Sequence, residues 1–177
     1  MEPDKAKIFR DAYVAQLKFE HTATKRCIEA VPDGKGDYAP HPTNMTAGTL
    51  AWHIASSEMW FMDGVLAGQF TFGGDTGRPE GINTGAEIAA WYEKQFADRV
   101  ARLEAMSGED LAKDVQFAMF NDPAVTYLSF AIRHSVHHRG QLSAYLRPMG
   151  AKVPAIYGGS ADEPFEMPAQ ETAAAQA

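Results

Sequence analysis

The chain has 177 residues, of which 45% are hydrophobic and 22% are charged, and its formal net charge at pH 7 is -7. This length and composition fit one globular domain with a core large enough to fold alone. The negative net charge excludes the strong positive field that attracts nucleic acid or an anionic membrane surface, so we expect neither as a partner.

The chain contains one cysteine, Cys27. No internal disulfide can form, and an unpaired thiol is typical of a reducing compartment. The N-terminal residues lack the basic start and apolar stretch of a signal peptide, and no apolar run approaches the about 18 residues that a membrane span needs. We therefore expect a cytoplasmic protein. No base neighbours Cys27 in the sequence, so we interpret it as a small packed residue rather than a nucleophile.

Two helices are predicted in the first part of the chain. The first covers roughly residues 4 to 31 and ends before a Pro-Asp-Gly turn. The second follows the proline-rich loop at residues 40–44, where Thr43, Asn44 or Thr46 could cap it, and runs to about Ala67. The apolar residues of the first helix recur at steps of three and four and would form its buried stripe: Ile8, Ala12, Ala15, Phe19 and Ala23.

Two more helices are predicted further along. The third opens at Thr84 with a capping box that Glu87 completes. The fourth opens at Asp122-Pro123, a cap followed by proline at the first helical position, and continues to about Met149. The segment 68–81 is too long for a hairpin between neighbouring helices, and at about 3.3 Å per residue it could climb a helix of about 20 residues.

These lengths predict an all-α fold, a four-helix bundle of up-down-down-up topology with a long crossover between the second and third helices. Phe70 and Phe72 in the crossover are candidates for a lid over a pocket. We assign residues 1–158 to the bundle. Residues 159–177 are acidic and rich in alanine and proline, so we expect them to form a flexible or loosely docked tail without a part in chemistry.

Three histidines are the strongest functional signal. His134 and His138 stand four residues apart in the fourth helix, so they differ by about 40° around its axis and project from one face. In the predicted topology, His53 of the second helix and His138 lie about 10 Å and about 16 Å from the same bundle end. Neutral imidazoles from two helices can hold a divalent metal. The alternative is three unrelated histidines, each hydrogen-bonded separately, but three interior imidazoles without a metal would need other polar partners.

The sequence around these histidines resembles a known family. His134–Leu142, followed by Tyr145–Gly150, resembles the HxxxHRGQ-to-LRxxG signature of the DinB/YfiT-like metalloenzymes. Leu50–Ala55 is similar to that family's first metal-histidine segment, and Tyr38–Pro42 to its WRPHP-type loop. The likeness extends over about residues 5 to 150. It implies an up-down-down-up four-helix bundle, often a homodimer, with a zinc- or nickel-type divalent ion bound by the three histidines.

The resemblance also implies a class of activity. Characterised relatives are thiol-dependent transferases or isomerases that use low-molecular-weight thiols such as bacillithiol, mycothiol or glutathione. We therefore expect a metal-dependent enzyme, a thiol transferase or a hydrolase, whose ion lowers the pKa of a bound thiol or water for attack on a small-molecule electrophile. The alternative is a non-catalytic bundle whose ion is structural or sensed. A structural site closes its coordination with a fourth protein ligand, whereas a catalytic site stays open.

Three neighbouring residues have two interpretations each, and a fourth, Gly140, has one. Gln141 either hydrogen-bonds a metal-binding histidine or packs its stem at the boundary of the core. His41 is either a surface residue or an acid-base group or fourth ligand. Arg139 points off the apolar stripe and forms a surface or interhelical ion pair or else binds an anion. Gly140 would permit close approach of a neighbouring helix.

Overall fold

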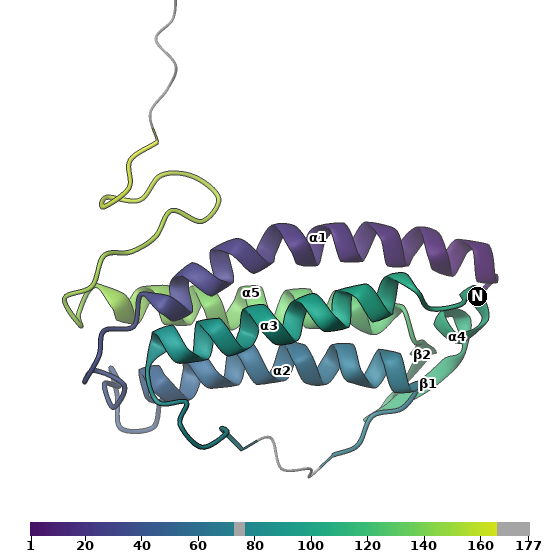
Figure 1. Ribbon diagram of the computed structural model, residues 1–177, viewed down its shortest axis with the longest axis horizontal. Coiled ribbons are helices and arrows are strands. Elements are labelled where there is room, and N and C mark those ends of the chain that lie inside the picture. The colour runs from purple at the N-terminus through teal and green to yellow at the C-terminus, as the bar shows by residue number, and fades with distance from the viewer. Residues whose placement is uncertain (73–76, 166–177) are drawn as a thin grey trace, which may run out of the picture.

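The computed structural model describes residues 1–72 and 77–165. The described chain is mostly helical, with one two-stranded sheet. Four long helices lie alongside one another, and the short elements gather at the end where the chain begins (Figure 1). The elements are α1 (Pro3–Glu29), α2 (Ala47–Ala67), α3 (Gly85–Glu104), α4 (Gly108–Ala112), β1 (Asp114–Phe117), β2 (Phe120–Pro123) and α5 (Thr126–Leu146).

The local signals at two helix starts are confirmed. Of the three possible caps for α2, the structure uses Thr46, whose hydroxyl oxygen accepts a hydrogen bond from the backbone N–H of Thr49. The predicted capping box of α3 is present, with Thr84 and Glu87 each accepting from the other's backbone. Helix α2 ends at Ala67, as predicted, because Gly68 adopts a left-handed conformation with φ of 64°.

The predicted start of the fourth helix is wrong, and the predicted all-α class misses a β-hairpin. Strands β1 and β2 pair antiparallel, and Asp122 and Pro123 are the last residues of β2. Helix α5 begins at Thr126 instead. The hydroxyl of Tyr127 explains the change: it donates to the carbonyl of Val115 at 2.7 Å and accepts from the N–H of Asp122 at 3.2 Å. This side chain ties both strands to the first turn of α5.

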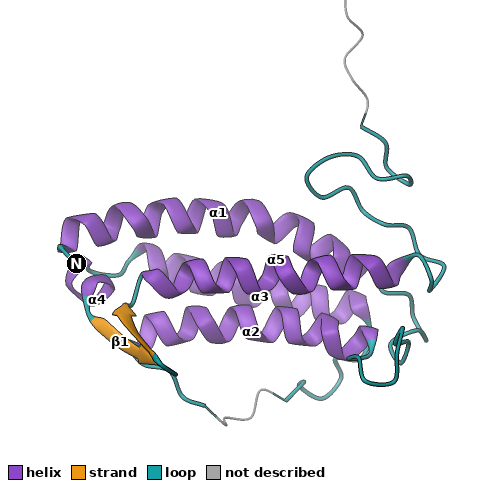
Figure 2. Cartoon of the chain, turned by 180° about the vertical axis from the view of Figure 1, so that it is seen from behind, coloured by secondary structure: helices purple, strands orange, loops and turns teal. Residues whose placement is uncertain are grey.

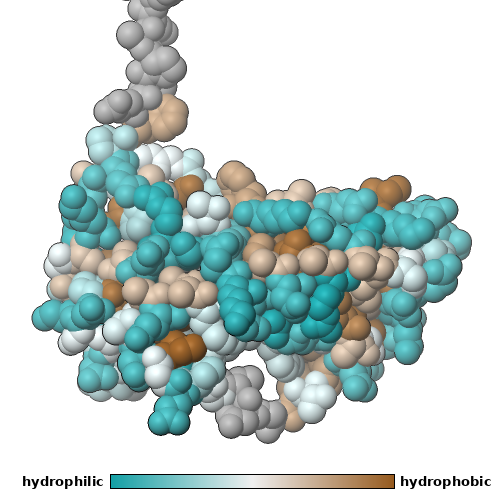
Figure 3. Space-filling view, viewed as in Figure 1, coloured by the Kyte–Doolittle hydropathy of each residue, from teal (hydrophilic) through white to brown (hydrophobic). Residues whose placement is uncertain are grey.

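Helix α1 buries the face opposite to the one predicted. Ile8 and Phe19 are 69% and 67% exposed, and Ala12 and Ala15 between them are exposed too. Apolar residues reach the surface along the upper edge of Figure 3, where α1 runs. The hydrophobic periodicity predicted the wrong face of α1 to be buried because several core positions of this helix carry polar side chains, which such a pattern assigns to the surface. The buried residues of α1 are Ala6, Val14, Leu17, Glu20, His21, Thr24, Cys27 and Ile28.

The core lies between the four long helices, each of which contributes buried apolar residues such as Leu17, Ile54, Tyr92 and Leu142. Cys27 is fully buried, as expected for a packed residue, and burial raises the pKa of its thiol to about 11. Within the described residues, no helix has the length and apolar character that crossing a membrane requires.

A buried ion pair joins α5 to α1. Arg139 and Glu20 are 1% and 6% exposed, and a guanidinium nitrogen lies 2.8 Å from the Glu20 carboxylate. The same guanidinium donates to the hydroxyl of Thr24 at 3.1 Å and to the hydroxyl of Tyr157, which in turn donates to Glu20. Arg139 thus makes the interhelical pair that the sequence favoured over anion binding, but in the core rather than at the surface.

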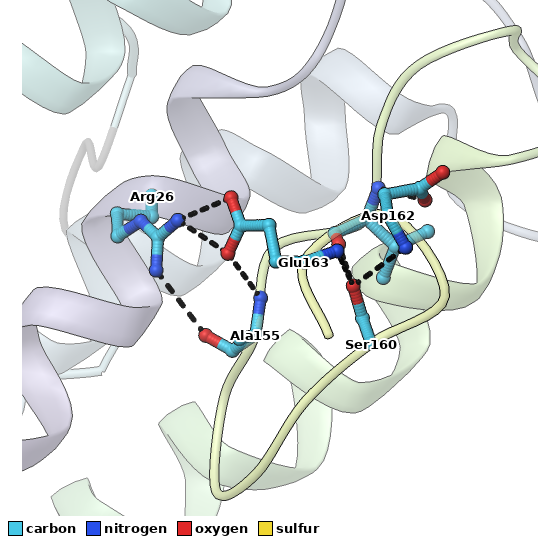
Figure 4. A network of polar contacts seen from close by, with 6 residues as sticks. Arg26, Ala155, Ser160, Asp162 and Glu163 are labelled. Carbon is cyan, nitrogen blue, oxygen red and sulfur yellow. Dashed lines mark hydrogen bonds and ion pairs between the residues drawn. The ribbon is translucent and has the colours of Figure 1, made fainter. Parts of the chain in front are cut away.

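The segment after α5 is held by polar contacts in the part that the structure describes. Glu163 accepts from Arg26 of α1 and from the backbone N–H of Ala155 (Figure 4). Ser160 accepts from the backbone N–H groups of Asp162 and Glu163, and Asp162 pairs with Arg147 at 2.7 Å. Residues 160, 162 and 163 of the predicted tail therefore make polar contacts, and residues 166–177 lie outside the described part.

Two glycines make a matched test of helix packing. A Cβ on Gly85, at the start of α3, would lie 2.5 Å from the carbonyl oxygen of Ile28, whereas one on Gly140 would meet no described residue within 4 Å. The suggested close approach of another helix at Gly140 is therefore wrong within this chain. We expect Gly85→Ala to lower the free energy of unfolding by about 1–3 kcal/mol. Gly140→Ala should raise it by up to about 1 kcal/mol through helix propensity. Urea denaturation of both variants checks the contrast, and equal effects would contradict it.

Candidate metal centre

The three predicted histidines come together between α2 and α5. These two helices lie side by side on the near face of Figure 2. The ring centroid of His53 lies 4.9 Å from that of His134 and 4.6 Å from that of His138, and the last two centroids are 4.4 Å apart. One nitrogen from each ring lies within 4.8 Å of the other two. The three rings are therefore close enough to converge on a single ion.

Two hydrogen bonds orient the imidazoles. The Nδ1 atom of His138 lies 2.7 Å from the Oε1 atom of Gln141. A carbonyl oxygen only accepts, so Nδ1 carries the proton and Nε2 presents its lone pair. The hydroxyl of Ser57 donates to the backbone carbonyl of His53 and lies 3.3 Å from the Nδ1 atom of the same residue. Its oxygen can therefore accept from that Nδ1–H, which again leaves Nε2 free.

This geometry resolves the role of Gln141 in favour of the hydrogen bond to a histidine. Ser57 was missed by the sequence reasoning, although a signal existed. It stands four residues after His53 and hence on the same side of α2. Polar residues one turn from a metal-binding histidine commonly fix its ring orientation and its tautomer.

His134 provides the test of whether a metal fits. Its Nδ1 atom is buried and has no hydrogen-bond partner among the described residues. An unsatisfied buried nitrogen costs free energy, and an ion that coordinated this atom would recover it. Burial, followed by the neighbouring His138 and His53, lowers the pKa of His134 to about 4, and burial also lowers the pKa of His53. At neutral pH these rings are uncharged, which is the form that binds metal. The residues therefore fit a divalent ion.

Among residues 1–72 and 77–165, no fourth histidine, cysteine or carboxylate joins the trio, and the cluster of possible metal ligands consists of the three histidines alone. His41 is exposed, and its Nδ1 atom lies 2.8 Å from the hydroxyl of Thr43 in its own loop. The structure thus places His41 outside the cluster. Three imidazoles without a fourth ligand are the donor set of an open site.

Aromatic residues surround the trio on the side of the hairpin. Phe61 of α2 lies 5.7 Å from the ring of His134 and 6.1 Å from the ring of Phe70. Phe72 stacks on Phe117 of β1, with centroids 5.6 Å apart. The two phenylalanines of the crossover therefore pack on the hairpin and next to a residue that touches His134. Their action as a lid stays a prediction.

A pocket of about 220 Å³ opens on the other side of the trio, towards the C-terminal end of α5. It lies between α5, the loop before α2 and the first turn of α2. His138 is its only wall residue from the trio among the described residues. Its lining consists of Asn44, Met45, Leu50, His138, Gln141 and Tyr145.

A buried carboxyl group sits on the core side of the same helices. Glu58 is 2% exposed, accepts from the hydroxyl of Tyr92 at 2.7 Å, and also accepts from the hydroxyl of Ser135. Burial raises the pKa of Glu58 to about 7, although both hydrogen bonds oppose the shift. The carboxyl group faces α3 and α5 and does not belong to the histidine cluster. It is therefore a structural group rather than a metal ligand.

Glu58→Gln should change how stability depends on pH. The folded state holds the Glu58 proton more tightly than the unfolded state, whose pKa is near 4.5. The proton therefore stabilises the fold fully below pH 4.5, and this contribution is lost as the pH rises to 7. It amounts to about 3 kcal/mol at 1.36 kcal/mol per pKa unit. We expect the loss between pH 4.5 and 7 to be smaller in Glu58→Gln, measured by urea denaturation at several pH values. Parallel curves for the two proteins would contradict the assignment.

With this geometry in place, comparison with known proteins identifies the family. The model of the DinB family matches residues 3–171. The chain belongs to the DinB family. Two curated DinB-like relatives from Bacillus subtilis are similar over most of their length. The uncharacterized protein YrdA is 26% identical over 157 residues, 86% of this chain and 90% of YrdA. The uncharacterized protein YjoA is 26% identical over 141 residues, 77% of this chain and 88% of YjoA.

Solved structures of DinB-like proteins share the fold. The crystal structure of a DinB-like protein from Bacillus cereus superposes with a TM-score of 0.70 at 25% identity, covering 83% of this chain and 97% of that one. YjoA superposes with a TM-score of 0.68 at 24% identity, covering 82% and 97%. The DinB resemblance seen in the histidine motif therefore extends to the whole helical body.

Proposed function

We propose that this DinB-family protein is a metal-dependent enzyme in which His53, His134 and His138 hold one divalent ion, zinc or nickel. The helices that carry them would belong to a four-helix bundle of up-down-down-up topology. The single observation that carries the proposal is the convergence of three imidazole nitrogens within 4.8 Å, without a fourth protein donor among the described residues. The unpartnered Nδ1 atom of His134 supports it independently.

The reaction that we propose is transfer of a low-molecular-weight thiol to a small electrophile, or a thiol-dependent isomerisation. A divalent ion bound by three imidazoles supplies Lewis acidity, which lowers the pKa of a thiol or water in its open position. The protein itself orients this site. Gln141 and Ser57 hold the Nδ1 protons of His138 and His53 in place, and the Phe61 ring beside His134 excludes water from one side. Hydrolysis by a bound water is the second reaction that this donor set supports.

The rival function is a non-catalytic protein whose ion stabilises or senses. The three-histidine set argues against a structural ion, because structural zinc sites are closed by four protein ligands. The discriminating property is therefore exchange at the open position. An exogenous ligand such as cyanide or azide should change the absorption spectrum of the cobalt-loaded protein if the position is open.

Turnover is the direct test. The metal-loaded protein, the metal-free protein and the His138→Ala variant should be assayed with glutathione, bacillithiol and mycothiol against a panel of small electrophiles. We expect turnover that requires both metal and His138. A stoichiometric ion without any metal-dependent turnover, and with an unchanged cobalt spectrum on adding cyanide, would overturn the catalytic proposal and support the structural one.

A further inference from the structure

The pocket beside His138 is elongated and small. It runs from His138 to Tyr145, two turns apart on α5 and hence about 10 Å along the helix axis. Its volume of about 220 Å³ is below the range of about 300–1,000 Å³ typical of sites for drug-sized ligands. It therefore suits a slender molecule of a few carbon atoms, with one end at the trio and the other near the bundle end.

The far end of the pocket has a defined hydrogen-bonding character. The amide nitrogen of Asn44 donates to the hydroxyl oxygen of Tyr145 at 3.1 Å. Because this oxygen accepts, the phenolic proton of Tyr145 stays available as a donor. The ring is held by edge contact with Tyr38, with centroids 5.9 Å apart, and the Asn44 backbone N–H donates to the carbonyl of His41 at 2.9 Å. Both partners are thus positioned before a ligand arrives.

The remaining walls decide the charge of the ligand. Met45 and Leu50 provide apolar surface between the two ends, and among the described residues no lysine, arginine, aspartate or glutamate lines the pocket. A ligand carboxylate or phosphate would find no cation at the Tyr145 end, and desolvating it there would be unfavourable. A neutral oxygen could accept from Tyr145 without that penalty.

We propose that Asn44 and Tyr145 select ligands that end in a neutral hydrogen-bonding oxygen, such as an amide or hydroxyl, joined by a short aliphatic link to the group that binds at the trio. This inference rests on the metal site proposed above and adds the chemical class of its ligand. Tyr145 is a specificity-determining residue in this scheme, because it touches the ligand but not the reacting atoms.

Hydroxamates of one chain length provide the probe, since they bind metal ions through one end. Three compounds ending in a primary amide, a methyl group or a carboxylate should be titrated calorimetrically into the zinc-loaded protein. We expect the amide to bind about fivefold more tightly than the methyl compound, and more tightly than the carboxylate. Tyr145→Phe should remove the preference for the amide over the methyl compound and leave the affinity for the methyl compound unchanged. Tyr13→Phe, in α1, is the control and should change nothing.

The outcomes separate this inference from the metal site. Zinc content measured on each protein reports the metal site alone. If zinc is bound and the wild-type protein does not distinguish amide from methyl, or if Tyr145→Phe keeps the preference, the ligand class is overturned and the metal site stands. If zinc is not bound stoichiometrically, both proposals fall.

Discussion

His134→Ala should reduce the affinity for zinc or nickel more than 100-fold, because the loss of even a residue that only orients a ligand costs about 10–100-fold. The variant would keep two imidazoles, His53 and His138, which are too few to hold an ion in competition with water. Affinity is measured by competition with a chromophoric chelator, and the metal content of protein purified without a metal-binding tag is measured by elemental analysis.

The neighbouring histidine is the matched control. His137 is exposed and its ring contacts that of His138, with centroids 4.8 Å apart, but it is not in the cluster, so His137→Ala changes the same turn of α5 without removing one of the three histidines. Its metal affinity should stay within a few-fold of the wild type. Gln141→Ala should lie between the two variants, since it removes only the hydrogen bond to His138. A stoichiometric, tightly held ion in His134→Ala would remove the basis of the proposed function.

Glu20→Met should lower the free energy of unfolding by about 3–5 kcal/mol, since it leaves the 1% exposed guanidinium of Arg139 without its carboxylate. The double variant Glu20→Met/Arg139→Met should recover much of this loss, because replacing both members of a buried pair by apolar residues of similar volume is often neutral. Chemical denaturation followed by far-ultraviolet circular dichroism measures the three proteins.

A solvent-exposed ion pair that is also made by α1 calibrates this expectation. Lys18 and Glu104 join α1 to α3 at 2.6 Å, but their side chains are 51% and 48% exposed. Glu104→Ala should therefore cost less than about 1 kcal/mol. If Glu20→Met costs no more than Glu104→Ala, burial does not govern the strength of the Arg139 contact.

The common face of His134 and His138 could be predicted from the sequence because it depends on local geometry, whereas the proximity of His53 depends on how α2 packs against α5. The four-residue spacing of His134 and His138 fixes their common face, and the caps at Thr46 and Thr84 are local as well. The hairpin was missed because Asp122-Pro123 has the form of a helix start. The tie that overrides it, the hydroxyl of Tyr127 on Val115, joins residues whose contact the pattern does not reveal.

The polar core could not be predicted for a related reason. Glu20, Glu58 and Arg139 look like surface residues to any method that reads hydrophobicity. Their burial is favourable only because partners on other helices satisfy them, and no spacing rule reveals those partners. For the same reason the wrong face of α1 was predicted to be buried, and Ile8 and Phe19 of that face are exposed in the structure. Contacts between residues that are far apart in the sequence are the part of this fold that cannot be predicted from one sequence.

Helix α5 is anchored on two sides within a single stretch of six residues. On one side of α5, His134 and His138 form the cluster with His53. On the other side, Ser135 and Arg139 bind the carboxyl groups of Glu58 and Glu20 in the core. The core contacts of Ser135 and Arg139 therefore fix the rotation of α5 about its own axis. This rotation in turn sets the direction in which the imidazoles of His134 and His138 point. By thermodynamic linkage, ion binding and folding reinforce each other. A substitution in the core that removes one of these contacts should consequently lower the affinity for the ion, even though it lies far from the coordinating nitrogens.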